Sequence, residues 1–193
     1  MIDLYTWHTP NGRKVSIMLE EIGMRYNVFP INIAKDEQFQ PHFLEVSPNN
    51  RIPAIVDKDN NNYSLFESGA ILMYLAEKSG KLINKSNSDE YYRTIEWLMW
   101  QMGGVGPMFG QVHHFVKYNK GKSAYAEERY SKEARRLYGV MDKRLGQHQY
   151  ISGKEYSIAD ISIWPWTARF DWQEIDLNEF PNVTRWYKEM ADR

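Results

Sequence analysis

The stretch NNRIPAIVDKDNNNYSLFESGAILMYL, residues 49–75, decides the fold of the first half of the chain. Its apolar run at Ile52–Val56 predicts a strand, Asp57–Asn62 is typical of a turn, and Tyr63–Phe66 predicts a second strand. We expect these two strands to form a hairpin. Directly after them, apolar residues at helical spacing predict a helix that ends at Gly80.

Three residues in this stretch have a chemical meaning beyond the fold. Pro53 lacks a backbone N–H, so it belongs at a sheet edge or a special turn, and a cis Ile52–Pro53 bond would leave the flanking backbone available to a peptide-like ligand. Glu67 and Ser68 stand at the N-terminus of the predicted helix, where N–H groups and a hydroxyl favour a carboxylate and Glu67 attracts an ammonium. An α-amino acid head group carries both charges. In the simpler alternative, Ser68 only caps the helix and Glu67 only complements its dipole.

The pattern RIPAIVD followed by LFESGAILMYLAEKSG resembles the glutathione-binding half of the cytosolic glutathione transferases. The resemblance implies a thioredoxin-like domain that binds the tripeptide. In that family the residue before a cis-proline pairs with the cysteinyl backbone, and a Glu-Ser or Asp-Ser pair holds the γ-glutamyl group. Carried over to this chain, those roles fall to Ile52, Glu67 and Ser68, with Pro53 as the structural proline.

The residues before the quoted stretch supply the remaining elements of such a domain. They predict two strands and two helical segments: strands at Ile2–Trp7 and Tyr26–Ile33, a helix from Pro10, and an irregular turn at Pro41–Val46. Thr9 suits the N-cap of that helix and Pro10 its first position, while Pro30 marks the second strand as an edge. The predicted order over residues 1–80 is β-α-β-α-β-β-α, an α/β thioredoxin-like domain.

A change of pattern divides the chain. Residues 81–88 are polar and without periodicity, which predicts a linker, and residues 89–193 predict an all-α C-terminal domain without strands. The first helix of that domain meets Gly103-Gly104 and Gly106-Pro107, where we expect it to kink or break and then resume. The longest helix is predicted at Tyr125–Leu145.

The sequence Ser157-Ile158-Ala159-Asp160 has the spacing of a capping box. We expect the Ser157 side chain to cap the helix that follows and Asp160 to reach back to the Ser157 amide. Loss of the Ser157 cap should lower the free energy of unfolding by about 1 kcal/mol. A final helix is predicted from Pro181.

Composition excludes several classes of function. The 193 residues carry a net charge of −1, which argues against a nucleic-acid or polybasic membrane partner, and no apolar run approaches the roughly 20 residues that cross a bilayer. The N-terminus lacks the form of a signal peptide, so we expect a soluble, cytoplasmic protein. His113 and His114 are adjacent on a predicted helix and point in different directions, and we predict no metal site.

The chain contains no cysteine, so it has no sulfur nucleophile of its own. A reactive sulfur must come from a ligand, and lowering a thiol pKa by about two units requires roughly 2.7 kcal/mol of stabilisation. One or two hydrogen bonds to the thiolate, at about 1.5–3 kcal/mol each, are sufficient. Tyr5, Thr9 and Asn11 are the candidates. We favour Thr9 and Asn11 as catalytic residues, because they follow the first strand at a helix N-terminus; in the alternative, Thr9 is only an N-cap and Asn11 a solvated first-turn residue.

Three segments, Thr9-Pro10-Asn11, SPNNRIPAIVD and WQMGGVGPMFGQVHHF, resemble the Nu class of bacterial glutathione transferases. The resemblance covers nearly the whole chain and stops at Asp192-Arg193, where members of the class usually continue. It implies a homodimer with two glutathione molecules, or one glutathione disulfide, in each site, and reduction of small disulfides above conjugation. The glutathione-binding positions it implies are Asn11, Gln38, Ile52, Glu67, Ser68 and Arg129. Arg129 is alternatively a solvated helix charge paired with Glu133.

Two functions remain open from the sequence. The first is a glutathione-dependent disulfide reductase, with possible weak transferase or peroxidase activity. The second is a non-catalytic module of the same fold that binds glutathione or regulates a partner. Thr9 and Asn11 beside Glu67 and Ser68 favour the enzyme.

Overall fold

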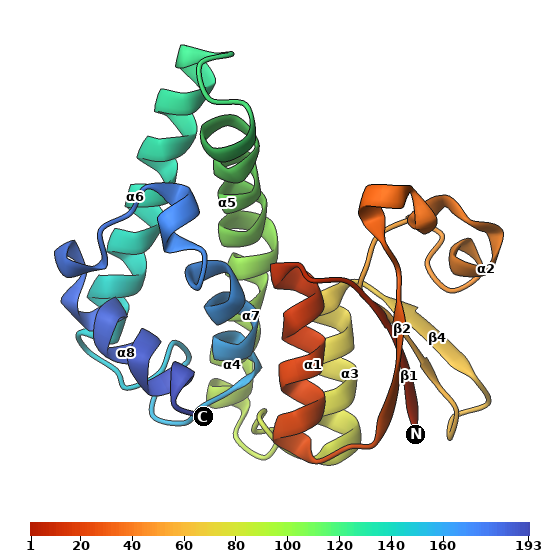
Figure 1. The fold of residues 1–193 in the computed structure, drawn as a ribbon. Helices are drawn as coiled ribbons and strands as arrows, with labels where there is room; N and C mark the ends of the chain where they lie inside the picture. The colour runs from red at the N-terminus through yellow and green to blue at the C-terminus, as the bar shows by residue number, and fades with distance from the viewer. The chain divides into compact units, whose positions relative to one another are not determined.

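The computed structural model describes all 193 residues and divides the chain into two compact units, Met1–Ile83 and Asn84–Arg193 (Figure 1). The division falls within the segment 81–88 that the sequence predicts as a linker. The first unit contains a sheet and helices, and the second is helical throughout. This agrees with the predicted fold class, a thioredoxin-like α/β domain followed by an all-α domain.

The sheet of the first unit has four strands in the order β2-β1-β3-β4. Their bounds are β1 Ile2–Thr6, β2 Tyr26–Pro30, β3 Ala54–Asp57 and β4 Tyr63–Phe66. Strands β1 and β2 are parallel, while β3 is antiparallel to both β1 and β4. The predicted hairpin is therefore β3–β4. Strand β2, which contains Pro30, is an edge strand as predicted.

Two helices lie side by side along one face of this sheet, α1 at Pro10–Ile22 and α3 at Ser68–Ser79 (Figure 1). The α1 side chains Val15, Met18 and Leu19 are fully buried, which is the stripe that its apolar periodicity predicts. Three short helical segments connect β2 to β3: Ile33–Lys35, Glu37–Phe39 and α2 at Pro41–Leu44. Phe43 of α2 belongs to a small hydrophobic cluster, and Tyr5 and Ile52 pack against this cluster.

Several predicted boundaries are wrong by a few residues. Strand β1 ends at Thr6 rather than Trp7, and α2 ends at Leu44 rather than Val46. Strand β2 ends at Pro30 rather than Ile33, because Asn32 caps a 3-10 turn through Oδ1, which accepts from the Ala34 amide at 3.0 Å. Strand β3 begins at Ala54 rather than Ile52, since Pro53 has no N–H to donate to the sheet.

The second unit is built from five α-helices and four shorter helical segments. The α-helices are α4 Ser88–Trp100, α5 Gly106–Val112, α6 Ala124–Leu145, α7 Ile158–Thr167 and α8 Pro181–Ala191. Two π-helical segments, Gln101–Val105 and His113–Tyr118, and two 3-10 turns, Phe170–Gln173 and Leu177–Glu179, connect them.

The predicted break at Gly103-Gly104 is a wide π-helical segment instead, and the helix continues through it into α5. A proline ring in an ordinary α-helix clashes with the carbonyl four residues earlier. The wider turn ahead of Pro107 moves that carbonyl away, and the two glycines add no side chains to the widened segment.

Helix α7 begins with a capping box formed by Ser157 and Asp160. The Ser157 hydroxyl accepts from the Ala159 amide at 3.2 Å, and the Ser157 amide donates to Asp160 Oδ2 at 3.1 Å. Asp160 is fully buried, and its Oδ1 also accepts from Trp186 Nε1 and the Ile151 amide, each at 2.9 Å. The carboxylate therefore joins α7 to α8 and to the loop before α7. Burial raises the pKa of Asp160 to about 6, although these donors oppose the shift.

Candidate functional site

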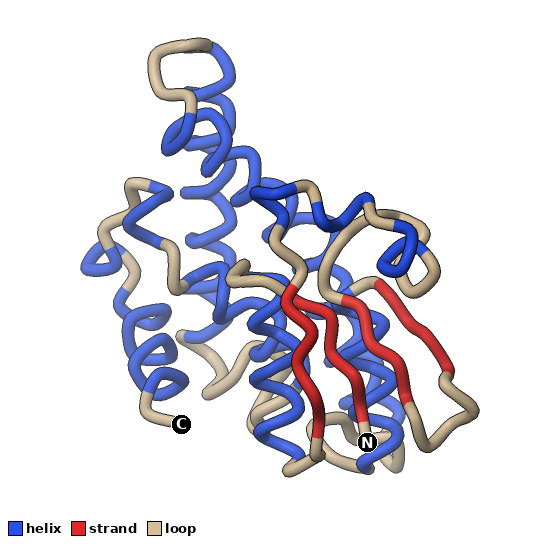
Figure 2. Tube along the Cα trace, turned by 45° about the vertical axis from the view of Figure 1, so that its right-hand side comes forward, coloured by secondary structure: helices blue, strands red, loops and turns tan.

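The strand register gathers the candidate residues of the first unit at one end of the sheet. Tyr5 lies opposite Ala54, and Ala54 lies opposite Phe66. Ile52, just before β3, and Glu67, just after β4, therefore stand beside the end of β1. This end of the sheet is opposite the end at which the chain begins. Figure 2 shows loops that continue from the strands at this end.

Thr9 caps α1 at this end. Its backbone is extended (φ −118°, ψ 160°), and its Oγ1 accepts from the Gly12 amide at 3.1 Å. A threonine hydroxyl has one hydrogen to donate besides the lone pair used here. Capping the helix and donating to a ligand are therefore compatible for Thr9. Asn11, the second residue of α1, is half-buried.

Gly12 allows α1 to start close to the end of β1. A Cβ at this position would clash with the Trp7 carbonyl oxygen and would lie 2.5 Å from Thr6 Oγ1. Only glycine lets the backbone approach so closely. This contact fixes where Thr9 and Asn11 stand relative to the sheet.

Tyr5, the alternative thiolate partner, belongs to an aromatic cluster. Its ring stacks on Phe29 with 4.9 Å between centroids and lies 6.2 Å from the Phe43 ring. Burial, with a smaller contribution from Asp3, raises the pKa of Tyr5. The geometry favours a packing role for this ring.

The backbone at Ile52 lies just before β3 and outside the sheet. The Ile52–Pro53 peptide bond is cis, and neither backbone group of Ile52 has a hydrogen-bond partner within the chain. The loop before it is held by Ser47, whose hydroxyl donates to the Arg51 carbonyl oxygen at 2.8 Å. A peptide ligand can pair with such open backbone groups, so the glutathione-binding role of Ile52 stays a prediction that this geometry allows.

Glu67 and Ser68 form the start of α3. Glu67 has φ 71° and ψ 112°, a conformation that residues other than glycine rarely adopt, and its exposed side chain makes no capping hydrogen bond. Ser68 is only 4% exposed, and its Oγ accepts from Lys14 Nζ at 3.2 Å. Strained backbone of this kind is concentrated at functional sites.

Gln38 has a buried side-chain oxygen that no donor of the folded chain satisfies. The side chain is 9% exposed, and its Oε1 is buried without a hydrogen-bond partner. Its Nε2 lies 3.4 Å from Asp36 Oδ1. A buried amide oxygen left without a donor is costly, so this atom is well suited to accept a hydrogen bond from a ligand.

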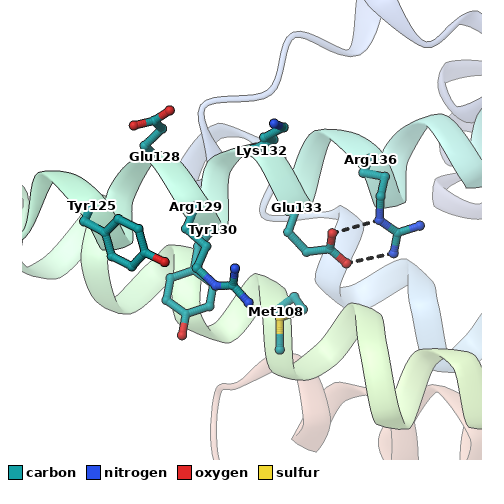
Figure 3. A pocket seen from close by; sticks show the side chains of 8 residues that line it. All are labelled: Met108, Tyr125, Glu128, Arg129, Tyr130, Lys132, Glu133 and Arg136. Carbon is teal, nitrogen blue, oxygen red and sulfur yellow. Dashed lines mark hydrogen bonds and ion pairs between the residues drawn. The ribbon is translucent and has the colours of Figure 1, made fainter.

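Arg129 lies in the second unit, on α6, where it lines a pocket of about 610 Å³ (Figure 3). The pocket is lined by Met108, Tyr125, Glu128, Arg129, Tyr130, Lys132, Glu133 and Arg136. Glu133 forms its ion pair with Arg136 and not with Arg129; the hydrogen bond from Arg136 lowers the pKa of Glu133 most, and the charge of Arg129 lowers it further. Arg136 occupies that carboxylate with two hydrogen bonds of 2.7 and 2.8 Å, because it lies one turn further along the same face of α6.

The adjacent histidines do not form a metal centre, and no group of three or more His, Asp or Glu side chains is arranged to hold an ion. His113 stacks on Trp166 and lies 3.2 Å from Gln173 Nε2. Burial, with a further contribution from Arg169, lowers the pKa of His113 to about 4. It is a neutral packing residue. None of the helices combines the length and apolar character that crossing a membrane requires.

Lys14 is the residue that the sequence did not single out. It is 1% exposed and contacts Ser68 through the hydrogen bond described above. The signal was present in the sequence, because Lys14 lies four residues before Met18 and eight before Ile22, on the buried stripe of α1.

Two family models match the chain: the glutathione S-transferase N-terminal domain over residues 1–77 and the glutathione S-transferase C-terminal domain over residues 124–189. The disulfide-bond oxidoreductase YfcG of Escherichia coli (strain K12) is 47% identical over 197 residues, covering 100% of this chain and 91% of YfcG. The chain belongs to the glutathione S-transferase family.

Solved structures of this family share the fold along the whole chain. A glutathione transferase family member from Pseudomonas fluorescens Pf-5, crystallised with two glutathione bound, has a TM-score of 0.94 and 46% identity, covering 100% of this chain and 88% of that one. A glutathione transferase from Pseudomonas putida, with one glutathione disulfide bound per subunit, has a TM-score of 0.92 and 44% identity, covering 100% and 87%.

Proposed function

We propose that this glutathione S-transferase is a glutathione-dependent disulfide reductase that binds glutathione at the end of the sheet where Thr9, Ile52 and Glu67 meet. The observation that carries the proposal is the strand register. It places an open backbone edge at Ile52 beside a helix N-terminus that carries Ser68. The cysteine of glutathione would pair with Ile52, and the γ-glutamyl head group would lie at Glu67 and Ser68.

The remaining contacts follow from the chemistry of the tripeptide. The unsatisfied Oε1 of Gln38 would accept an N–H from glutathione, and Asn11 would contact the ligand from the first turn of α1. Arg129 stays a prediction of the family resemblance, in which its guanidinium would hold a carboxylate. We also infer a homodimer, from the family alone.

We infer that Thr9 would stabilise the glutathione sulfur as a thiolate. Its oxygen is used by the Gly12 amide, so its hydrogen is available for the sulfur at the positive end of the α1 dipole. A hydrogen bond to a charged group contributes about 1.5–3 kcal/mol, which is enough to lower a thiol pKa by one to two units.

The reaction uses only ligand sulfur, because the protein has no cysteine. The thiolate of one glutathione attacks a sulfur of the substrate disulfide, forms a mixed disulfide and releases one substrate thiolate, which takes up a proton. A second glutathione thiolate then attacks the glutathione sulfur of the mixed disulfide. The products are glutathione disulfide and the second substrate thiol.

The test is reduction of bis(2-hydroxyethyl) disulfide by glutathione, followed as formation of glutathione disulfide. The proposal expects turnover well above the uncatalysed rate, saturable in both substrates. If the protein binds glutathione in calorimetry but gives no turnover with this or other small disulfides, the reductase assignment fails and the chain is a binding module.

A further inference from the structure

Thr9 can serve only one of the two sulfurs that change charge in the proposed reaction. Each attack on a disulfide expels a substrate thiolate, and the attacking, central and leaving sulfurs lie nearly in line. With an S–S bond of about 2.05 Å, the attacking and leaving sulfurs are roughly 4 Å apart. The Thr9 hydroxyl has one hydrogen to donate, and the attacking sulfur uses it. A proton for the leaving sulfur must therefore come from a neighbouring group.

His8 directly precedes Thr9 at the apex of the loop between β1 and α1. The Thr9 amide donates to the Trp7 carbonyl oxygen at 2.7 Å, which closes a three-residue turn with His8 at its centre. Gly12 of α1 packs closely against the same carbonyl oxygen, so the helix holds this turn in place. The side chain at the centre of so tight a turn points away from it, and His8 is exposed.

The His8 imidazole keeps both ring nitrogens available to a ligand. Its ring lies 5.2 Å from the half-buried Trp7 ring, at an interplanar angle of 52°. This ring contact limits the motion of the imidazole, and no hydrogen bond or ion pair of the fold occupies its nitrogens. A histidine side chain can both give and take a proton near neutral pH. His8 therefore combines the chemistry and the position that the leaving sulfur requires.

We propose that His8 is the general acid that protonates the departing substrate sulfur. The inference rests on the proposed disulfide reductase and deepens it, because it assigns the proton transfers of the same site. Thr9 holds the attacking sulfur as a thiolate, and His8, one residue earlier in the chain, acts on the sulfur that leaves.

The protons of the reaction balance on this one side chain. The bound glutathione gives its thiol proton to the His8 imidazole. Its thiolate then breaks the S–S bond of the substrate, and the departing sulfur takes that proton from the imidazolium. A second glutathione loses its proton to His8 in the same way and attacks the mixed disulfide, and the second substrate sulfur receives the proton. Two glutathione thiols become glutathione disulfide, two substrate thiols form, and the imidazole ends neutral.

The experiment compares two disulfides whose leaving thiolates differ in basicity. Bis(2-hydroxyethyl) disulfide releases a basic thiolate, whereas dithiobis(2-nitrobenzoate) releases a thiolate that is stable without a proton. His8→Gln should lower kcat/KM for the first disulfide about a hundredfold, the low end of what a positioned general acid contributes, and leave the second almost unchanged. His114→Gln, at an exposed histidine of the second unit, is the matched control and should change neither.

Added imidazole tests the assignment in a second way. It should restore the reduction of bis(2-hydroxyethyl) disulfide by His8→Ala without accelerating the unaltered protein, while calorimetry should show the same glutathione affinity for His8→Gln and the unaltered protein. Full activity of His8→Gln, equal losses for both disulfides, or weaker glutathione binding would overturn the inference, the last two by giving His8 a structural role in the loop. If the unaltered protein reduces neither disulfide, the proposed function fails instead.

Discussion

Thr9 Oγ1 accepts a hydrogen bond from the Gly12 amide at 3.1 Å, and the same glycine brings α1 against the end of β1. The hydrogen bond between Thr9 and Gly12 therefore caps α1 and also fixes the position of the Thr9 hydroxyl. Two consequences can be measured separately, one for catalysis and one for stability.

Thr9→Ala should lower kcat/KM for disulfide reduction by about tenfold to a hundredfold, because one hydrogen bond to the thiolate is lost. It should also lower the free energy of unfolding by about 1 kcal/mol, through loss of the cap. Thr9→Ser keeps both interactions and should retain most of the activity. Tyr5→Phe is the comparison: an inactive Tyr5→Phe beside an active Thr9→Ala would place the thiolate at Tyr5.

Gly12→Ala should destabilise the protein by about 1–3 kcal/mol, since the added methyl group meets the Trp7 carbonyl oxygen and Thr6 Oγ1. Urea unfolding measures the loss. Gly139→Ala is the matched control, because a Cβ at Gly139 has no neighbour within 4 Å. Equal stability of Gly12→Ala and the unaltered protein would show that the close approach is absent in solution.

Glu67→Gly should separate stability from binding. Glycine adopts the φ of 71° without strain, so the free energy of unfolding should stay unchanged or rise by up to about 1 kcal/mol, while glutathione binding weakens. Glu67→Ala keeps the strain and loses the carboxylate, so it should weaken binding to the same extent without a gain in stability. A Glu67→Gly protein that binds glutathione normally contradicts the role given to this side chain.

Asp160 should make stability depend on pH in a defined direction. Its folded pKa is raised from 3.8 to about 6, so the folded state binds the extra proton between these values and its stabilising contribution is lost as pH rises through them. Asp160→Asn loses acceptors for Ser157 and should destabilise by about 2–4 kcal/mol, more at pH 4 than at pH 7. A pH-independent difference in urea unfolding would contradict this.

Local sequence signals predicted the order of elements well, because strand periodicity, Thr9-Pro10 and Gly80 each act within a few residues. The strand ends were less predictable. The Asn32 side chain caps a 3-10 turn where we expected β2 to continue. Pro53 has no N–H for the sheet, so β3 begins one residue after it. Lys14 was overlooked because a lysine on a helix is usually solvated, and only the packed structure shows it buried beside Ser68. The partner of Glu133 depended on a choice between two arginines of one helix, Arg129 and Arg136, that spacing alone does not decide.

The most direct test of the glutathione site is calorimetric titration of the folded, cysteine-free chain with glutathione and with glutathione disulfide. We expect a saturable binding isotherm for both ligands and much weaker binding of both to Glu67→Ala. Absence of any binding heat at millimolar ligand, with circular dichroism showing a folded protein, would contradict the claim that this end of the sheet is a glutathione site.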